Sequence, residues 1–168
     1  MSHHFTFRQE VRESDPVVVR DIVESTGFFY DHETEVAVEL VDERLQKGEE
    51  SGYHFLFAEK DGKTAAYACF GLIPCSRNSY DLYWIVVHDS FRGQGLGKML
   101  MDKTMEVIAG MGGGNVYIET SSREKYLPTQ KFYDSCNCIL EARLKDFYDK
   151  GDDKLIYVKR ADDICLLK

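Results

Sequence analysis

The sequence predicts an α/β fold: a single domain over residues 1–168, with a mixed sheet of about seven strands flanked by about four helices. The length of 168 residues suffices for one good hydrophobic core but not for two. Strand-like and helix-like segments follow one another in the order β-α-α-β-β-β-α-β-α-β-β. Near the middle, a glycine-rich turn joins an apolar strand to a helix, which is typical of this class.

The N-terminal third is predicted to contain one strand and two helices. Loose alternation of polar and apolar residues predicts the strand over Phe5–Glu13. Asp15-Pro16 marks a helix start, because Asp can cap and Pro suits the first turn, and Gly27 ends this helix. A second helix is predicted over Glu33–Gln46, with Gly48 as its stop. We expect each helix to bury one apolar stripe: Val19, Ile22 and Val23 in the first, and Val38, Val41 and Leu45 in the second.

Three strands and a helix are predicted next. Tyr53–Glu59 and Lys63–Leu72 form a hairpin around the turn signal Asp61-Gly62. Ser79–His88 is apolar on both faces, so we place it inside the sheet rather than at an edge. The glycine turn then opens a helix whose buried stripe is expected to contain Leu96, Met99, Leu100 and Val107.

The C-terminal third is predicted to add one helix and three strands. Glycines at positions 110 and 112–114 end the preceding helix, and a short strand follows over Asn115–Thr120. Pro128–Ser135 is predicted as a short helix. The last strands are Ile139–Tyr148 and Lys154–Lys159, which are joined through Gly151-Asp152-Asp153.

Composition excludes several classes of protein. With 43% hydrophobic and 12% aromatic residues, the chain is neither disordered nor collagen-like. Its apolar runs fall far short of the roughly 18 residues that a membrane span needs, and no apolar secretory signal is visible. The five cysteines form no Cys-x-x-Cys pair, which argues against a metal site and predicts free, mostly buried thiols in a reducing cytoplasm.

The formal net charge is -8, and the whole acidic excess lies before Ile85. A chain this acidic is poorly suited to nucleic acid, because neutralisation of phosphates dominates that affinity. An acidic face would favour a cationic partner such as an amine. Ordinary solubility would explain the same charge, so both interpretations stay open.

The turn Arg92-Gly93-Gln94-Gly95-Leu96-Gly97-Lys98 is suited to bind a pyrophosphate. The first N–H groups of a helix lack helical partners, the helix dipole adds positive potential, and glycine lets an anion approach the backbone. We expect positive φ to be needed at Gly95 and Gly97. The dinucleotide fingerprint and the P-loop both fail here, because Lys98 and Arg92 stand where those motifs need Gly. The pattern that fits is Q/R-x-x-G-x-G/A.

Two segments carry a family resemblance. Residues 82–100, LYWIVVHDSFRGQGLGKML, resemble the acetyl-CoA-binding motif of the GNAT family of N-acetyltransferases. Residues 129–138, TQKFYDSCNC, are similar to the later helix motif of that family, and the element order matches over nearly the whole chain. The chain departs from the family at Asp89, where Pro is frequent, and at Asn137-Cys138, where Gly-Phe is usual. Asn tolerates the left-handed conformation, so we expect the second turn to persist.

The resemblance implies acetyl-CoA as co-substrate and no metal. The backbone of Arg92, Gly93, Gln94, Gly95, Leu96, Gly97 and Lys98 would grip its pyrophosphate. The strand edge at Val86 and Val87 would pair with pantetheine and offer a backbone N–H to the thioester oxygen. The implied reaction is direct aminolysis by a primary amine, which is either a small amine or amino acid, or a peptide N-terminus. The rival interpretation is a non-catalytic acyl-CoA-binding sensor or scaffold.

The resemblance also implies which residues move protons. Tyr133 stands where the family places a tyrosine that protonates the leaving thiolate, although the same position also serves packing. Glu119 resembles the glutamate of the ribosomal-protein N-terminal acetyltransferases, with a small insertion before Tyr133. Asp81 stands where the histone-acetylating branch has its glutamate, and is the second candidate for accepting the amine proton. For both carboxylates, a merely solvated side chain is the alternative.

Acceptor specificity is expected from two places. The first is the loop with Phe28, Phe29 and Tyr30, and the second is the last hairpin with Tyr148. The hairpin segment 146–153 resembles the aromatic and acidic hairpin of the N-terminal acetyltransferases. Asp152 and Asp153 would either meet an ammonium or form only a turn. The expected partner is thus a primary-amine acceptor, without nucleic acid or membrane, and a homodimer is compatible with the sequence.

Overall fold

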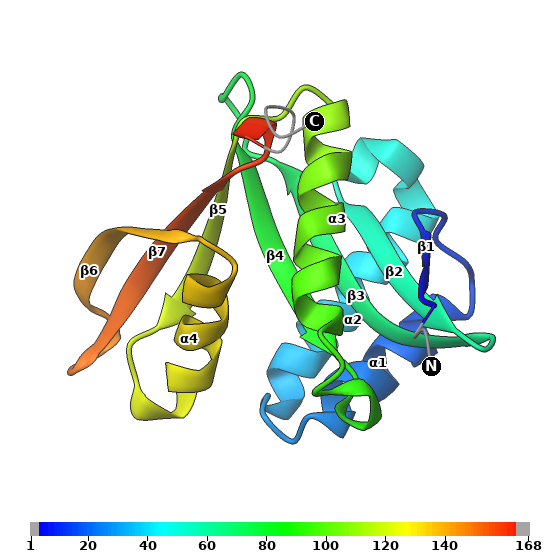
Figure 1. The fold of residues 1–168 in the computed structure, drawn as a ribbon, viewed down its shortest axis with the longest axis horizontal. Coiled ribbons are helices and arrows are strands. Elements are labelled where there is room, and N and C mark those ends of the chain that lie inside the picture. The colour runs from blue at the N-terminus through cyan, green and yellow to red at the C-terminus, as the bar shows by residue number, and fades with distance from the viewer. Residues whose placement is uncertain (1–3, 164–168) are drawn as a thin grey trace. The chain divides into compact units, whose positions relative to one another are not determined.

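The structure is a computed structural model that describes residues 4–163 (Figure 1). Its α-helices are α1 (Asp15–Ser25), α2 (Asp31–Lys47), α3 (Leu96–Gly110) and α4 (Leu127–Ser135). Its strands are β1 (Thr6–Arg8), β2 (His54–Lys60), β3 (Lys63–Leu72), β4 (Tyr80–Val87), β5 (Asn115–Ser121), β6 (Ile139–Asp149) and β7 (Asp152–Arg160). Most predicted boundaries therefore lie within two residues of the observed ones.

The strands are hydrogen-bonded in the order β1-β2-β3-β4-β5-β7-β6. The pairs β1–β2, β2–β3, β5–β7 and β6–β7 are antiparallel, whereas β4 and β5 are parallel. The predicted α/β class with a mixed sheet is confirmed, and so is the placement of β4 inside the sheet. That residues 1–168 form a single domain stays a prediction.

By their contacts, the described residues fall into two compact units, which we describe in turn. Unit 1 comprises residues 4–71 and 84–104, and unit 2 comprises residues 72–83 and 105–163. Unit 1 thus contains β1, α1, α2, β2 and the glycine turn. Unit 2 contains the start of β4 together with β5, α4, β6 and β7.

Unit 1 has a core between its first two helices and the strands β2 and β3. The stripes predicted for α1 and for the first part of α2 are buried in it. They pack with Phe55 and Phe57 of β2 and Tyr67 of β3, whose rings are stacked. Phe55 and Phe57 are two residues apart, so the strand presents both rings on the same face. Burial of such aromatic side chains supplies much of the hydrophobic stabilisation of a core.

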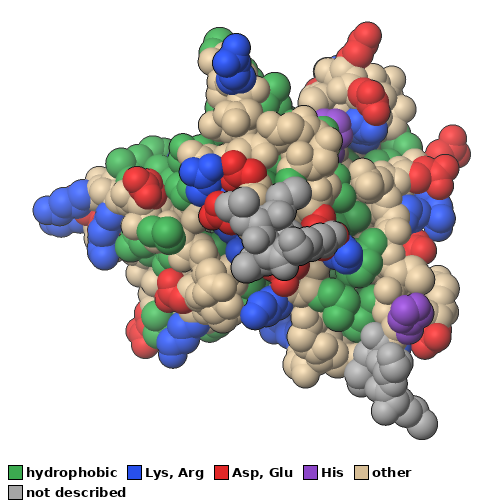
Figure 2. Space-filling view, turned by 45° about the horizontal axis from the view of Figure 1, so that its top comes forward, with side chains coloured by type: hydrophobic (Ala, Val, Ile, Leu, Met, Phe, Trp, Pro, Cys, Tyr) green, Lys and Arg blue, Asp and Glu red, His purple; other side chains and the backbone are tan. Residues whose placement is uncertain are grey.

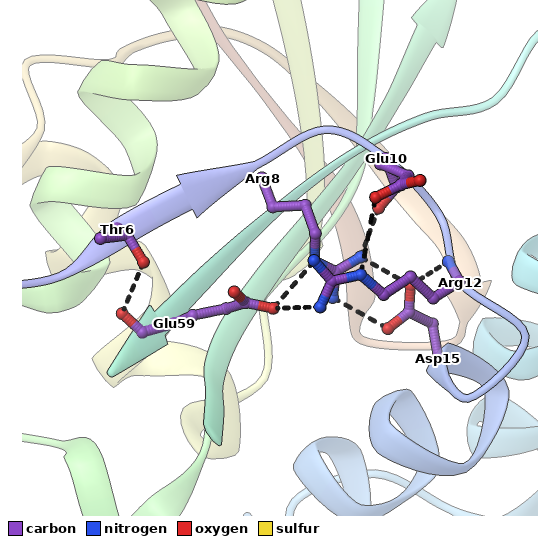
Figure 3. A network of polar contacts seen from close by, with 6 residues as sticks. All are labelled: Thr6, Arg8, Glu10, Arg12, Asp15 and Glu59. Carbon is purple, nitrogen blue, oxygen red and sulfur yellow. Dashed lines mark hydrogen bonds and ion pairs between the residues drawn. The ribbon is translucent and has the colours of Figure 1, made fainter. Parts of the chain in front are cut away.

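The N-terminal strand is shorter than predicted, because β1 covers Thr6–Arg8 rather than residues 5–13. Arg8 makes a two-pronged ion pair with Asp15 at 2.8 and 3.0 Å, and its Nε donates to Glu59 at 2.8 Å (Figure 3). The backbone N–H of Arg12 donates to the same Asp15 carboxylate at 2.6 Å. These bonds turn the chain out of the strand and into α1. The side chains of Arg8 and Asp15 are only 9% and 1% exposed, so the pair is a buried anchor.

Two residues of the predicted buried stripes are exposed. Leu45 is 37% exposed, because the buried positions of α2 end one turn earlier, at Val41. Met99 is also 37% exposed, and Val107 is half-buried. The apolar residues of α3 occupy more than one face, so spacing alone did not select the buried one. The buried side of α3 is formed by Leu96, Leu100, Met101, Thr104, Met105 and Ile108.

Unit 2 combines the antiparallel ladder β5-β7-β6 with α4 (Figure 1). Tyr133 of α4 is buried and its ring lies 5.4 Å from that of Tyr157 in β7. Helix α4 ends as predicted, because Asn137 takes φ 58° and the N–H of Cys138 donates to the carbonyl of Tyr133 at 3.0 Å. Strand β6 lies at the edge of the sheet, and nearly all its side chains are exposed.

The thiols agree with prediction in the part of the chain that the structure covers. Cys69 and Cys138 are free and buried, Cys136 is also buried, and Cys75 is free and exposed. Cys165 lies outside the described residues. Among residues 4–163, no group of three or more His, Cys, Asp or Glu side chains is placed to hold a metal ion.

The surface shows no segregation of charge on the face drawn in Figure 2. Acidic and basic side chains lie beside one another there, with apolar side chains between them. The acidic excess of the first half is therefore not gathered into one patch on this face. None of the helices in residues 4–163 has the length and apolar character needed to cross a membrane.

Candidate active site

The end of β4 leads into the glycine turn of unit 1. The side chain of Val86 is buried in the core, and that of Val87 is half-buried. The N–H of His88 donates to the carbonyl of Ala65 in β3 at 2.9 Å. The strand end is thereby fixed on its β3 side. Whether its other edge pairs with pantetheine, as the resemblance implies, stays a prediction.

Two glycines of the turn adopt the left-handed conformation that other residues avoid. Gly93 has φ 73° and Gly95 has φ 74°. We expected this at Gly95 and Gly97, and the expectation for Gly97 is wrong. Gly97 is not among the residues with positive φ, because α3 already begins at Leu96.

The turn has the features of an anion site. The first helical hydrogen bond after the turn runs from the N–H of Met99 to the carbonyl of Gly95 at 3.2 Å, so the N–H groups of residues 96–98 precede the helical ladder. A Cβ added at Gly93 or Gly95 would meet no atom within 4 Å, which leaves open space beside the backbone. Backbone donors, the dipole of a 15-residue helix and the basic side chains at positions 92 and 98 fit a pyrophosphate.

Hydrogen bonds within unit 1 hold the turn. The backbone N–H of Asp89 donates to Ser25 Oγ at the end of α1, at 3.0 Å. A proline at this position would lack that donor, which accounts for the departure from the family pattern. Lys60 Nζ of β2 donates to Gln94 Oε1 at 3.4 Å, and the Arg92 guanidinium lies 3.5 Å from the Asp89 carboxylate.

The aromatic loop after α1 is partly packed into unit 1. The Phe28 and Phe29 rings meet edge to face at 5.1 Å, and Phe29 in turn contacts the Trp84 ring at 5.2 Å. Tyr30 is 57% exposed, and its backbone N–H donates to Glu33 at the start of α2, at 2.8 Å. The role of these three predicted residues in acceptor binding stays a prediction.

A pocket of about 270 Å³ opens in unit 2. It is lined by Asp81, Leu82, Tyr83, Tyr117, Glu119 and Tyr148. Both carboxylates that the resemblance singled out are thus brought together, along with Tyr148. Tyr83 and Tyr117 were not predicted as site residues.

Strand register explains why these side chains share one face. Asp81 of β4 is paired with Tyr117 of β5. Glu119 lies two residues beyond Tyr117 and therefore points to the same side, as Tyr83 does from β4. Alternation along β4 puts Asp81 and Tyr83 on one face of the strand. The register between β4 and β5 is a long-range property, and no local signal revealed it.

Lys154 of β7 places a positive charge next to Glu119, one of the two carboxylates of the pocket. Its Nζ lies 2.7 Å from Glu119 Oε2, 3.8 Å from the centre of the Phe147 ring and 5.7 Å from that of Tyr148. The Lys154 side chain is 13% exposed, whereas that of Glu119 is 47% exposed. Sequence reasoning missed this lysine, because nothing near it in the sequence marks its partner.

Asp81 carries the perturbed carboxylate of the pocket. Burial raises its pKa, the charge of Glu119 raises it further, and Lys154 lowers it. Within the described residues, the carboxylate of Asp81 has neither a hydrogen-bond nor an ion-pair partner. Burial also raises the pKa of Tyr148 to about 12, so this hydroxyl stays protonated at neutral pH.

The predicted acidic turn of the last hairpin is not a turn. Asp152 and Asp153 belong to β7, and their side chains are buried. Asp152 accepts a hydrogen bond from Ser121 Oγ and pairs with Arg123 at 3.0 Å. Asp153 pairs with Arg143 at 2.5 Å. Both carboxylates therefore have internal partners, which corrects the expectation that they either meet an ammonium or form only a turn.

Tyr133 occupies the end of α4 with its ring in the interior of unit 2. It is 6% exposed, and burial raises the pKa of its hydroxyl well above the ordinary value. The hydroxyl is therefore protonated at neutral pH, as an acid must be before it acts. The ring also packs on Tyr157, so both interpretations of Tyr133 made from the sequence keep support.

Comparison with known proteins gives a family and several structural relatives. Residues 18–137 match the model of the acetyltransferase (GNAT) family. No curated protein matches the sequence. A GNAT-family protein from Desulfovibrio desulfuricans is 44% identical, with a TM-score of 0.92 over 94% of this chain and 99% of that chain.

Two more distant structures share the fold. The ribosomal-protein-S18-alanine N-acetyltransferase from Escherichia coli is 17% identical, with a TM-score of 0.71 over 94% of either chain. An aminoglycoside 6'-N-acetyltransferase complexed with coenzyme A is 14% identical, with a TM-score of 0.71 over 94% of this chain and 97% of that chain.

Proposed function

Because the chain belongs to the GNAT family of acetyltransferases, we propose that it transfers the acetyl group of acetyl-CoA to a primary amine by direct aminolysis. The observation that carries the acceptor half of this proposal is the pocket of unit 2. There the half-buried carboxylate of Asp81 lies among three tyrosines, and within residues 4–163 this carboxylate has no hydrogen-bond or ion-pair partner. An ammonium group has the charge to match that carboxylate and binds well against aromatic rings.

The donor half rests on the glycine turn. Acetyl-CoA, the co-substrate, supplies an activated thioester. The N–H groups at the start of α3 would bind its pyrophosphate, with Gly93, Gln94 and Gly95 keeping the approach open and Arg92 and Lys98 adding positive charge. The relative that was solved with coenzyme A supports this co-substrate.

The proton steps require two groups. An amine arrives mostly as ammonium and must lose a proton before it attacks, and either Asp81 or Glu119 would accept it, directly or through water. The departing thiolate needs a donor, and Tyr133 would supply its hydroxyl proton. A backbone N–H at Val86 or Val87 would stabilise the thioester oxygen as negative charge develops.

The acceptor is either a small amine or amino acid, or a peptide N-terminus. The two distant relatives act on acceptors of both kinds, an aminoglycoside and a ribosomal protein, and at their identity they support the fold alone. Tyr148 and the loop of Phe28, Phe29 and Tyr30 would contact the acceptor. We keep the cytoplasm as the proposed location, which the free thiols support, and a homodimer as a prediction.

Release of free thiol from acetyl-CoA tests this function. A panel of small amines, amino acids and short peptides is offered to the protein, and the product is identified by its added acetyl mass. The proposal predicts thiol release that depends on the amine. The rival function, an acyl-CoA sensor or scaffold, predicts binding of acetyl-CoA without turnover for every member of the panel.

A further inference from the structure

Lys154 places an ammonium of the protein itself against the pocket that would receive the acceptor. Its Nζ contacts the Glu119 carboxylate at 2.7 Å and lies over the Phe147 ring at 3.8 Å. The Lys154 side chain is largely buried, so packing as well as charge holds the contact. Glu119 therefore already has the cation that an acceptor would otherwise provide.

We infer that Lys154 is a positioning residue that neutralises Glu119, so that Asp81 is the carboxylate that accepts the acceptor's proton. This inference rests on the proposed function and decides between the two carboxylates that it left open. A carboxylate in an ion pair is a poor proton acceptor, because protonation breaks the pair. Asp81 lies in the same pocket without such a partner.

The charges around Asp81 show how Lys154 acts. Glu119 faces Asp81 from β5 and Lys154 faces it from β7, and their effects on its pKa have opposite signs. The other titratable groups of the pocket are Tyr83, Tyr117 and Tyr148, and burial raises the pKa of Tyr148 to about 12. Arg123, which follows β5, is engaged by Asp149 and Asp152. Glu119 and Lys154 pair with each other. Asp81 is therefore the carboxylate of the pocket that has no paired cation among the described residues.

A double-mutant cycle read as pH profiles tests this role. The proton acceptor must be ionised, so kcat/KM falls as pH drops through the pKa of Asp81. Lys154→Met removes the charge that lowers this pKa, and the acidic limb should move up by about half a pH unit. Glu119→Gln removes the charge that raises it, and the limb should move down by a similar amount. The double variant loses both effects and should return close to the wild-type profile.

Two further variants separate charge from packing. Lys154→Arg keeps the positive charge and should keep the wild-type limb. Lys150→Met makes the same charge change in the exposed turn between β6 and β7, and should leave the limb in place. A Lys154 whose role is only structural would instead lower kcat/KM at every pH in Lys154→Met, with no return in the double variant, and that result overturns the inference.

NMR titration of the Asp81 carboxyl carbon gives a readout without turnover. The pKa of Asp81 should rise in Lys154→Met, fall in Glu119→Gln and return in the double variant. An Asp81 titration that is the same in all four proteins overturns the role of Lys154, even if acetyl transfer is found. If no amine is acetylated by the wild type, the proposed function and the proton-acceptor role fail together. The NMR titration still decides whether the charge of Lys154 lowers the pKa of Asp81.

Discussion

The glycine turn of unit 1 and the pocket of unit 2 are built from different parts of the chain. The turn offers backbone N–H groups, and two of its glycines hold φ values near 74° with open space where a side chain would stand. The pocket offers side chains: two carboxylates, three tyrosines and a leucine, with a lysine ammonium paired to one of the carboxylates. Binding at the turn thus depends on backbone geometry, whereas binding in the pocket depends on the charges of side chains.

This difference between the turn and the pocket predicts how each region should respond to substitution. Backbone donors bind any phosphate ester that fits, and they fail when the backbone path or the approach is blocked. A pocket of side chains depends on the sum of its charges, so shape-preserving changes of charge should alter it most. Unit 1 also uses charge, but in the buried Arg8–Asp15 pair, where it serves the fold and not a site.

Breaking that buried pair should have the largest effect. Asp15→Asn leaves Arg8 buried with Glu59 as its remaining carboxylate partner, and should lower the free energy of unfolding by about 3 kcal/mol. Urea denaturation measures this change. The surface pair Arg20–Glu35 has the same two-pronged geometry in solvent, so Glu35→Gln should change stability far less. Equal effects of the two substitutions would contradict the distinction between buried and exposed pairs.

Removing the charge of Asp81 should have the next largest effect, on catalysis rather than stability. Asp81→Asn keeps the shape but cannot accept a proton, and should lower kcat at neutral pH by about 10²-fold. Part of the loss should return as pH rises, because free amine becomes available. Glu119→Gln should cost less than about fivefold, and steady-state kinetics compare the two. A larger loss for Glu119→Gln would move the proton acceptor to Glu119.

Tyr133 is interpreted either as the acid that protonates the thiolate or as a packing residue. Removing its hydroxyl distinguishes the two. Tyr133→Phe keeps the ring that packs on Tyr157 and removes only the acid. If the hydroxyl protonates the leaving thiolate, kcat should fall by about 10²-fold while acetyl-CoA binds as before. A kcat within about twofold of wild type would assign Tyr133 to packing alone.

The turn could be predicted from the sequence far better than the pocket, for a physical reason. A glycine turn before a helix and the left-handed Asn137 are local, so neighbouring residues encode them. The expectation of positive φ at Gly97 is wrong because α3 already begins at Leu96.

The pocket depends on contacts between residues far apart in the sequence. The family resemblance predicts Asp81 and Glu119 as site residues. Only the register of β4 against β5 brings them into one pocket. Lys154 was missed because the pairing of β5 with β7 decides its neighbours, and Asp152 was misplaced because the pairing of β6 with β7 puts it in a strand. Such pairings follow from the packing of the whole sheet, which periodicity along one strand does not encode.

The smallest expected effect gives the most direct test, because it shows whether the turn binds acetyl-CoA independently of the pocket. Calorimetric titration of acetyl-CoA into wild type, Gly95→Val and Asp81→Asn measures donor binding alone. Gly95→Val places a side chain on a backbone with φ 74° and should weaken binding by about tenfold or more, whereas Asp81→Asn should bind as the wild type does. Unchanged binding by a folded Gly95→Val, or an equal loss in Asp81→Asn, would contradict the account.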